Sequence, residues 1–181
     1  MEASAPPKQP GNPRRQTKRI LVLGLGNEML SDDAAGLHVA REMRQPLSDW
    51  EGIEVQETSE MGLSLLDYIV GFDDLVLVDA VQTGQAPPGF LHEFDGDEMK
   101  ALPTMSPHFF GIGEALALGR RLGLSVPCRV KVFAIEVSDP WTVKTCMTPQ
   151  LQQCLPGIIE RILGIVRELE WQPVERREGF L

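Results

Sequence analysis

Short apolar runs, bounded by glycine or by charged residues, recur along the chain and predict the strands of a sheet. Continuous runs are typical of strands buried on both faces, whereas alternation is typical of a half-buried strand. The predicted strands are Arg19–Gly26, Ile53–Thr58, Asp74–Val81 and Arg129–Ile135. Gly89–Phe94 is also strand-like, but residues 82–88 are too few for a crossover helix, so we expect an antiparallel edge strand there.

Between these runs, apolar residues recur at three and four positions, which predicts helices. The predicted helices are Asp33–Arg44, Gly62–Gly71, a segment starting at Ser106 and Pro107, and a segment starting at Thr148 and Pro149. Ser31 or Asp32 is placed to cap the first helix, and Pro156 is expected to kink or divide the last. The order of elements predicts an α/β fold, a three-layer domain with a mostly parallel twisted sheet of about five strands and helices on both faces.

Length and charge limit the organisation and the partners. The 181 residues suit one domain, which we expect at 19–171, with a disordered basic and proline-rich arm at 1–18 and a flexible tail at 172–181. The net charge of −9 argues against binding nucleic acid through its phosphates. No apolar run is long enough to span a membrane. Three cysteines without a paired motif are typical of a reduced, cytoplasmic protein; the pattern leaves the oligomeric state open.

Acidic residues gather where a parallel sheet places its ligand sites, beyond the carboxyl ends of the strands. Asp33 follows the first strand, and Asp79 lies near the end of the third, where a charge needs a partner. His108, at the start of the third helix, completes a set of two carboxylates and an imidazole that suits a divalent metal ion. Such residues also serve as helix caps, acceptors of backbone amides or surface histidines, and their spacing leaves both interpretations open.

The turn after the first strand, Gly24–Met29, begins like a dinucleotide-binding loop but has Met29 in place of the third glycine. Asp32 and Asp33 at the helix start would repel a phosphate. Glu57, after the second strand, is placed like the acid that binds a ribose. A nucleotide-binding module therefore stays as a minor alternative.

Three blocks resemble the hydrogenase maturation endopeptidases in order and spacing. They are ILVLGLGNEMLSDDAAGLHVA (Ile20–Ala40), GLSLLDYIVGFDDLVLVDAV (Gly62–Val81) and SPHFFGIGEAL (Ser106–Leu116), within a resemblance that covers about residues 19–170. The resemblance implies a cytoplasmic protease that removes the C-terminal extension from the large-subunit precursor of a nickel–iron hydrogenase after nickel insertion. The nickel would then be supplied by the substrate, and the resting protein can be free of metal.

The resemblance also implies a site. Asp33, Asp79 and His108 match the family residues that bind the metal and are thereby expected to be catalytic. Gly26 and Asn27 are expected to support the site by shaping the turn that lets the peptide approach. A nickel metallochaperone that binds the metal without cutting remains an alternative.

One loop departs from the family pattern. The family usually has DGGT where this chain has ETSEMG (Glu57–Gly62), so Glu57 keeps the carboxylate but lengthens it. We therefore expect Glu57 in a substrate-binding or supporting role, and Glu57, Glu60 and Asp32 are each candidates for a general base. Outside this loop, His38 and His92 are expected to be ordinary histidines, and Glu136 and Asp139 to be either acids of the crevice rim or solvated loop acids.

Overall fold

The computed structural model describes residues 18–96, 98 and 107–170, with only the backbone described for 107–110 and 170. The predicted tail and all but the last residue of the predicted arm therefore lie outside the described residues. The chain forms a five-stranded sheet in the order β2-β1-β3-β5-β4. Its strands are β1 (Ile20–Leu25), β2 (Ile53–Thr58), β3 (Asp74–Val81), β4 (Leu91–Asp95) and β5 (Arg129–Glu136).

The sheet is mostly parallel, as predicted. β1 pairs in parallel with β2 and β3, and β3 with β5. β4 is the antiparallel edge strand, and it pairs with β5. The predicted α/β class is therefore confirmed.

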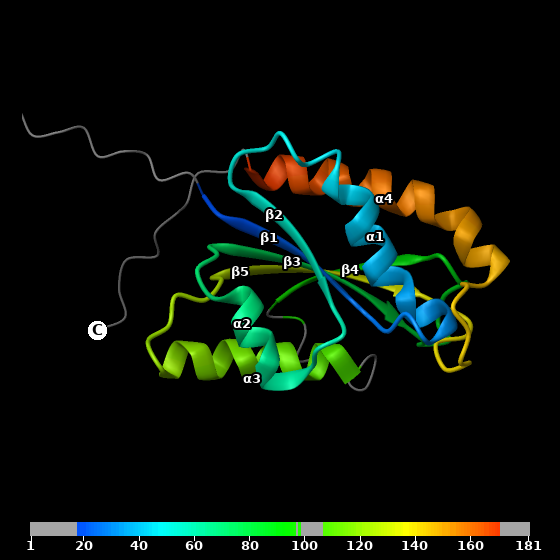
Figure 1. The fold of residues 1–181 in the computed structure, drawn as a ribbon, viewed down its shortest axis with the longest axis horizontal. Helices are drawn as coiled ribbons and strands as arrows, with labels where there is room; N and C mark the ends of the chain where they lie inside the picture. Colours follow the sequence, from blue (N-terminus) through cyan, green and yellow to red (C-terminus); the bar gives the residue numbers. More distant parts are fainter. Residues whose placement is uncertain (1–17, 97, 99–106, 171–181) are drawn as a thin grey trace, which may run out of the picture.

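Helices cover both faces (Figure 1). They are η1 (Ser31–Ala34), α1 (Ala35–Arg44), η2 (Gly62–Leu65), α2 (Leu66–Ile69), α3 (Pro107–Arg121) and α4 (Pro149–Glu170), where η marks a 3₁₀ helix. α1 and α4 lie on one face of the sheet, and α2 and α3 lie on the other (Figure 1). No helix in the described part of the chain is long and apolar enough to cross a membrane.

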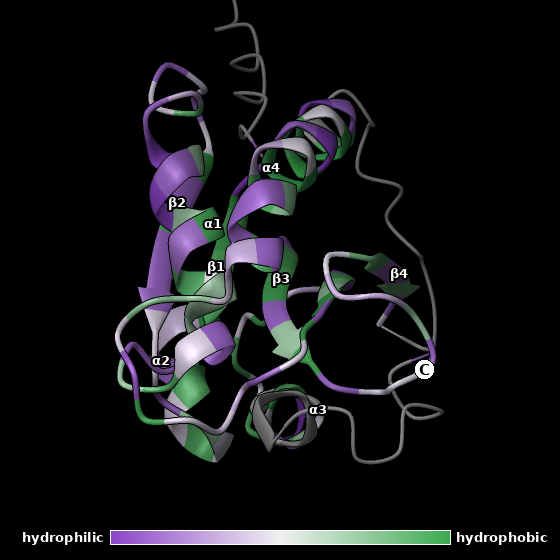
Figure 2. Cartoon of the chain, turned by 90° about the vertical axis from the view of Figure 1, so that its right-hand side faces the viewer, coloured by the Kyte–Doolittle hydropathy of each residue, from purple (hydrophilic) through white to green (hydrophobic). Residues whose placement is uncertain are grey.

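Each face of the sheet has its own apolar core, because successive strand residues point to opposite faces. Val76 and Val78 of β3 belong to the core under α1 and α4, whereas Leu75, Leu77 and Val81 belong to the core under α2 and α3. Figure 2 shows the hydrophobic face of α4 turned toward the sheet and its hydrophilic face turned outward. By this alternation, Asp79 belongs to the face that α2 and α3 cover.

Two helix predictions need correction. Residues 62–71 form a 3₁₀ turn and a single α-helical turn rather than one regular helix. α4 also runs without division through Pro156. The proline ring is exposed, while Leu155 and Ile158 on either side of it are buried against the sheet. Proline cannot donate a backbone hydrogen bond, and the burial of apolar side chains along α4 offsets the stability lost for that reason.

Candidate active site

The carboxyl ends of the parallel strands meet at one edge of the sheet, which contains a topological switch point. β1 and β3 are neighbours, yet the chain leaves β1 toward β2 and leaves β3 toward the opposite side of the sheet. A crevice beyond two such strands is the usual ligand site of open α/β sheets. Asp33 and Asp79 both lie at this edge.

Glycines let helix α1 begin directly against the strand ends. Gly26 has a φ of 149°, and a Cβ atom there would lie 2.1 Å from the carbonyl oxygen of Asp33. A Cβ atom on Gly36 would lie 2.4 Å from the carbonyl oxygen of Val78. Side chains at these two positions would push η1 and α1 away from β1 and β3. The glycines therefore hold Asp33 close to the end of β1.

Asn27 builds the turn between β1 and η1. Its Oδ1 accepts a hydrogen bond from the Met29 amide at 3.0 Å, and its carbonyl oxygen accepts one from the Leu30 amide at 3.0 Å. An asparagine side chain that folds back on its own backbone in this way fixes a turn locally. In this structure the Asn27 side-chain oxygen shapes the backbone that leads to Asp33.

The two acidic residues of the predicted site differ in exposure. The Asp79 side chain is fully buried, and its Oδ1 accepts a hydrogen bond from the Ala80 amide at 2.8 Å. Asp33 is half-buried within η1, which contacts β3. Neither η1 nor α1 has a side-chain cap, so Asp33 is not a helix-capping residue. The fold thus brings two carboxylates to one edge without a capping role for the more exposed one.

His108 lies in the first turn of α3, and its side chain lies outside the described residues. The backbone of this helix is placed by a close contact with η2. A Cβ atom on Gly111 would lie 2.4 Å from the Gly62 amide nitrogen. The described side chains alone contain no group of three metal-ligating residues. The geometry therefore places the helix of His108 on the face to which Asp79 belongs, and the three-residue site stays a prediction.

Asp32 has a structural role that the sequence did not indicate. It is fully buried, and its carboxylate accepts hydrogen bonds from the amides of Ser138, Asp139 and Thr148 at 2.7–3.3 Å. The hydroxyl groups of Ser138 and Thr148 donate to it as well. The predicted cap is wrong for both candidates, because Ser31 donates its hydroxyl to the Cys146 carbonyl oxygen. Asp32 instead attaches the loop of residues 138–148 to η1.

Comparison with known proteins identifies the family. The hydrogenase maturation protease family model matches residues 37–165. The chain belongs to this family. It is 28% identical to the hydrogenase 2 maturation protease of Escherichia coli over 162 residues, which cover 87% of this chain and 96% of the relative.

Solved structures of the family share the fold. The hydrogenase maturating endopeptidase HybD of E. coli matches with a TM-score of 0.71 and 25% identity, covering 83% of this chain and 93% of that one. The hydrogenase maturation protease HybD of Thermococcus kodakarensis matches with a TM-score of 0.62 and 23% identity, covering 84% of this chain and 99% of that one. The second likeness shows that the fold is shared at 23% identity.

The segment Glu57–Gly62, where we expected a departure from the family pattern, is held by an ion pair. Arg41 of α1 contacts the Glu57 carboxylate through Nε at 2.8 Å and also forms an ion pair with Glu28. The hydrogen bond to Glu57 raises the pKa of the Arg41 guanidinium above its ordinary value. The Glu57 side chain is therefore held by Arg41. Thr58 is buried and donates its hydroxyl to Tyr68 at 2.9 Å, so the loop is also joined to α2.

A second acidic centre lies at this edge, around Glu136, and its contacts were not predicted. Glu136 is 1% exposed and accepts hydrogen bonds from the amides of Thr83 and Gly84, each at 2.8 Å, while His92 lies 2.9 Å from it. Burial alone would raise the pKa of this carboxyl, but the hydrogen bonds from Thr83, His92 and Gly84 outweigh it and lower the pKa. Glu136 is thus not a solvated loop acid, and His92, which was expected to be an ordinary histidine, is its partner. The sequence contained one indication of this contact: if β4 pairs with β5, His92 and Glu136 lie on the same face of the pair.

Proposed function

We propose that this chain is an endopeptidase that removes the C-terminal extension of a nickel–iron hydrogenase large-subunit precursor after nickel insertion. One observation supports the proposal most directly. In a chain of the hydrogenase maturation protease family, Asp33 and Asp79 lie at one edge of the sheet, and α3, with His108 in its first turn, lies on the face to which Asp79 belongs. A large-subunit precursor is the partner implied for such a protease.

The substrate's nickel is proposed to bind to Asp33, Asp79 and His108. Two carboxylates and one imidazole leave coordination positions open for ligands from the substrate. A metal ion in such a site polarises the scissile carbonyl group or lowers the pKa of a bound water molecule. Asp79 is fully buried, and a carboxylate withdrawn from water attracts a nearby cation more strongly than an exposed one does.

The structure narrows the candidates for a general base. Asp32 is fully buried, and its hydrogen bonds already satisfy both carboxylate oxygens. Glu57 is bound by Arg41. Glu60 is exposed on the loop, and its amide donates to the Thr58 hydroxyl. Asp32 therefore has a structural role, and Glu60 is the most exposed of the three.

Mass spectrometry of a nickel-loaded precursor tests the proposal. The purified chain should reduce the precursor mass by that of one C-terminal peptide, whereas the single variants Asp33→Ala, Asp79→Ala and His108→Ala should leave the precursor intact. Asp49→Ala, an exposed acid with no part in the site, is the matched control and should cut as wild type does. Intact precursor in a stable complex with the wild-type chain would instead favour the metallochaperone alternative. Normal cutting by all three site variants would refute the assigned site.

A further inference from the structure

A histidine and a buried carboxylate are paired at the sheet edge that carries the candidate active site. Nε2 of His92, on β4, lies 2.9 Å from Oε2 of Glu136, the last residue of β5. Phe90 and Phe94 hold the imidazole between them, with ring centroids 4.8 and 6.1 Å from its own. We refer to His92 and Glu136 as the His92–Glu136 dyad. A carboxylate that orients an imidazole is a common arrangement in sites of proton transfer.

The surroundings of Glu136 determine which ring nitrogen of His92 carries the proton. Burial opposes ionisation of the Glu136 carboxyl, but hydrogen bonds from Thr83 and Gly84 outweigh it and lower the pKa. The carboxylate is therefore ionised at neutral pH and can only accept a hydrogen bond from the ring. In the neutral imidazole, Nε2 then carries the proton, and Nδ1 keeps the lone pair that accepts one.

The dyad shares a face of the sheet with Asp79. Ala134 of β5 pairs with Asp79 of β3 on one side and with His92 of β4 on the other, so the three residues form one row across the sheet. Two strand spacings of about 4.8 Å place the Cα atoms of Asp79 and His92 roughly 10 Å apart. Ala134 belongs to the core under α2 and α3, and all three side chains point toward that face.

Few charges share this face with the dyad. Side chains alternate along β3, β4 and β5, all three of which the structure describes in full, and only Asp79 and Glu136 are charged on the face of His92. The acidic and basic residues of α3 are exposed, and they are Glu114, Arg120 and Arg121. No lysine or arginine of these strands therefore replaces His92 as the partner of Glu136.

Resting on the proposed function, we propose that His92 transfers the proton during cleavage and that Glu136 is its positioning residue. Hydrolysis of a peptide bond needs a base for the attacking water and an acid for the leaving nitrogen, and one histidine can serve as both. Nδ1 takes a proton from the water as the water oxygen bonds to the scissile carbonyl carbon. The ring then gives this proton to the nitrogen as the carbon–nitrogen bond breaks, and the C-terminal peptide leaves with a free amine.

Steady-state cleavage of the nickel-loaded precursor tests the role of His92. His92→Gln keeps an N–H group for Glu136 but cannot carry a proton, so kcat should fall about 100-fold or more while KM stays within about twofold. His92→Ala should lose as much and recover with increasing concentrations of added imidazole. Thermal unfolding checks that both variants are folded. The matched control is His38→Gln on α1, at the opposite face, which should cut as wild type does.

The role of Glu136 is tested by combining variants. Glu136→Gln should lower kcat but leave KM unchanged, and adding it to His92→Gln should cause no further loss, because Glu136 acts through the ring. A wild-type kcat in His92→Gln would overturn the proposal and leave the proposed function intact. Loss of cleavage in Glu60→Gln with a normal kcat in His92→Gln would assign the proton transfer to Glu60 instead. A wild-type chain that leaves the precursor intact would refute both proposals.

Discussion

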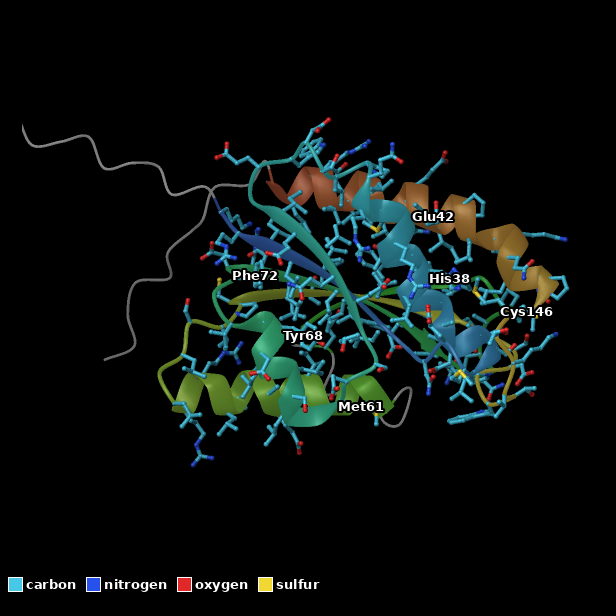
Figure 3. The ribbon with its side chains drawn as sticks, in the orientation of Figure 1. His38, Glu42, Met61, Tyr68, Phe72 and Cys146 are labelled. Atoms are coloured by element: carbon cyan, nitrogen blue, oxygen red, sulfur yellow. The ribbon has the colours of Figure 1, made fainter. Side chains whose placement is uncertain are left out.

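Arg41 and Glu57 form an ion pair at 2.8 Å that joins helix α1 to the end of β2, where the Glu57–Gly62 segment begins. The guanidinium also binds Glu28 in the turn before η1, so one cation connects two loops on either side of the candidate site. Met61, at the far end of this segment, lies beside α3 (Figure 3). Arg41 thus fixes the first residue of this segment, Glu57, in place.

A double-mutant cycle measures this pair. We expect Arg41→Gln and Glu57→Gln each to lower the free energy of unfolding, with a coupling of about 0.5–1 kcal/mol because both side chains are partly exposed. The coupling should decrease as salt is added. The exposed Arg44 on the same helix is the control, and Arg44→Gln should show no coupling to Glu57. A coupling unaffected by salt would contradict an ion pair.

Asp32 and Asp33 are adjacent but are expected to behave in opposite ways. Asp32→Ala leaves the buried donors of Ser138, Asp139 and Thr148 without their acceptor and should cost about 3 kcal/mol of unfolding free energy. Asp33→Ala should cost less than half as much and yet abolish cleavage. Urea denaturation provides the first comparison, and precursor mass provides the second. An equally stable Asp32→Ala variant would disprove the anchoring role.

The close contact of Gly111 with Gly62 is expected to position the start of α3. Gly111→Ala places a methyl group 2.4 Å from the Gly62 amide nitrogen and should cost about 1–3 kcal/mol, with a loss of cleavage as the turn of His108 shifts. Gly113 is the matched control, because it lies in the same helix and nothing lies within 4 Å of a Cβ atom there. Gly113→Ala should raise stability by about 0.5–1 kcal/mol. Similar effects at both positions would argue against the contact.

The pH dependence of stability tests the Glu136 centre. Folding lowers the pKa of Glu136 below its ordinary value of 4.5, so the ionised form stabilises the fold. This contribution is complete above pH 4.5 and is lost as the pH falls through the lower pKa of the folded state. Thermal unfolding should therefore show a difference between wild type and Glu136→Gln that shrinks below about pH 4.5. Glu51→Gln, at an exposed loop position, should show no such change.

Local patterns predicted the strands well because burial determines them. β1 and β3 are buried at every position, so their apolar runs could be interpreted without knowledge of their neighbours. Pro156 shows the limit of this reasoning, since burial of the residues around it maintains α4 where the local rule expects a break. A local propensity is thus overridden when tertiary packing is extensive.

The hydrogen bonds of buried polar side chains were harder to predict from the sequence than the strands were. The partners of Asp32 lie 106–116 positions further along the chain, and no local spacing connects them. His92 and Glu136 are 44 positions apart and meet through the pairing of β4 with β5. By contrast, the sequence could predict that Asp33 and Asp79 lie at one edge of the sheet, because the carboxyl ends of parallel strands meet there.

The most direct test of the account compares a nickel-loaded precursor with the same precursor free of nickel, each incubated with the wild-type chain and followed by intact mass. The account predicts that a C-terminal peptide is released from the nickel-loaded precursor alone, and that Asp79→Asn releases none. Equal release with and without nickel, or release by Asp79→Asn at the wild-type rate, would contradict it.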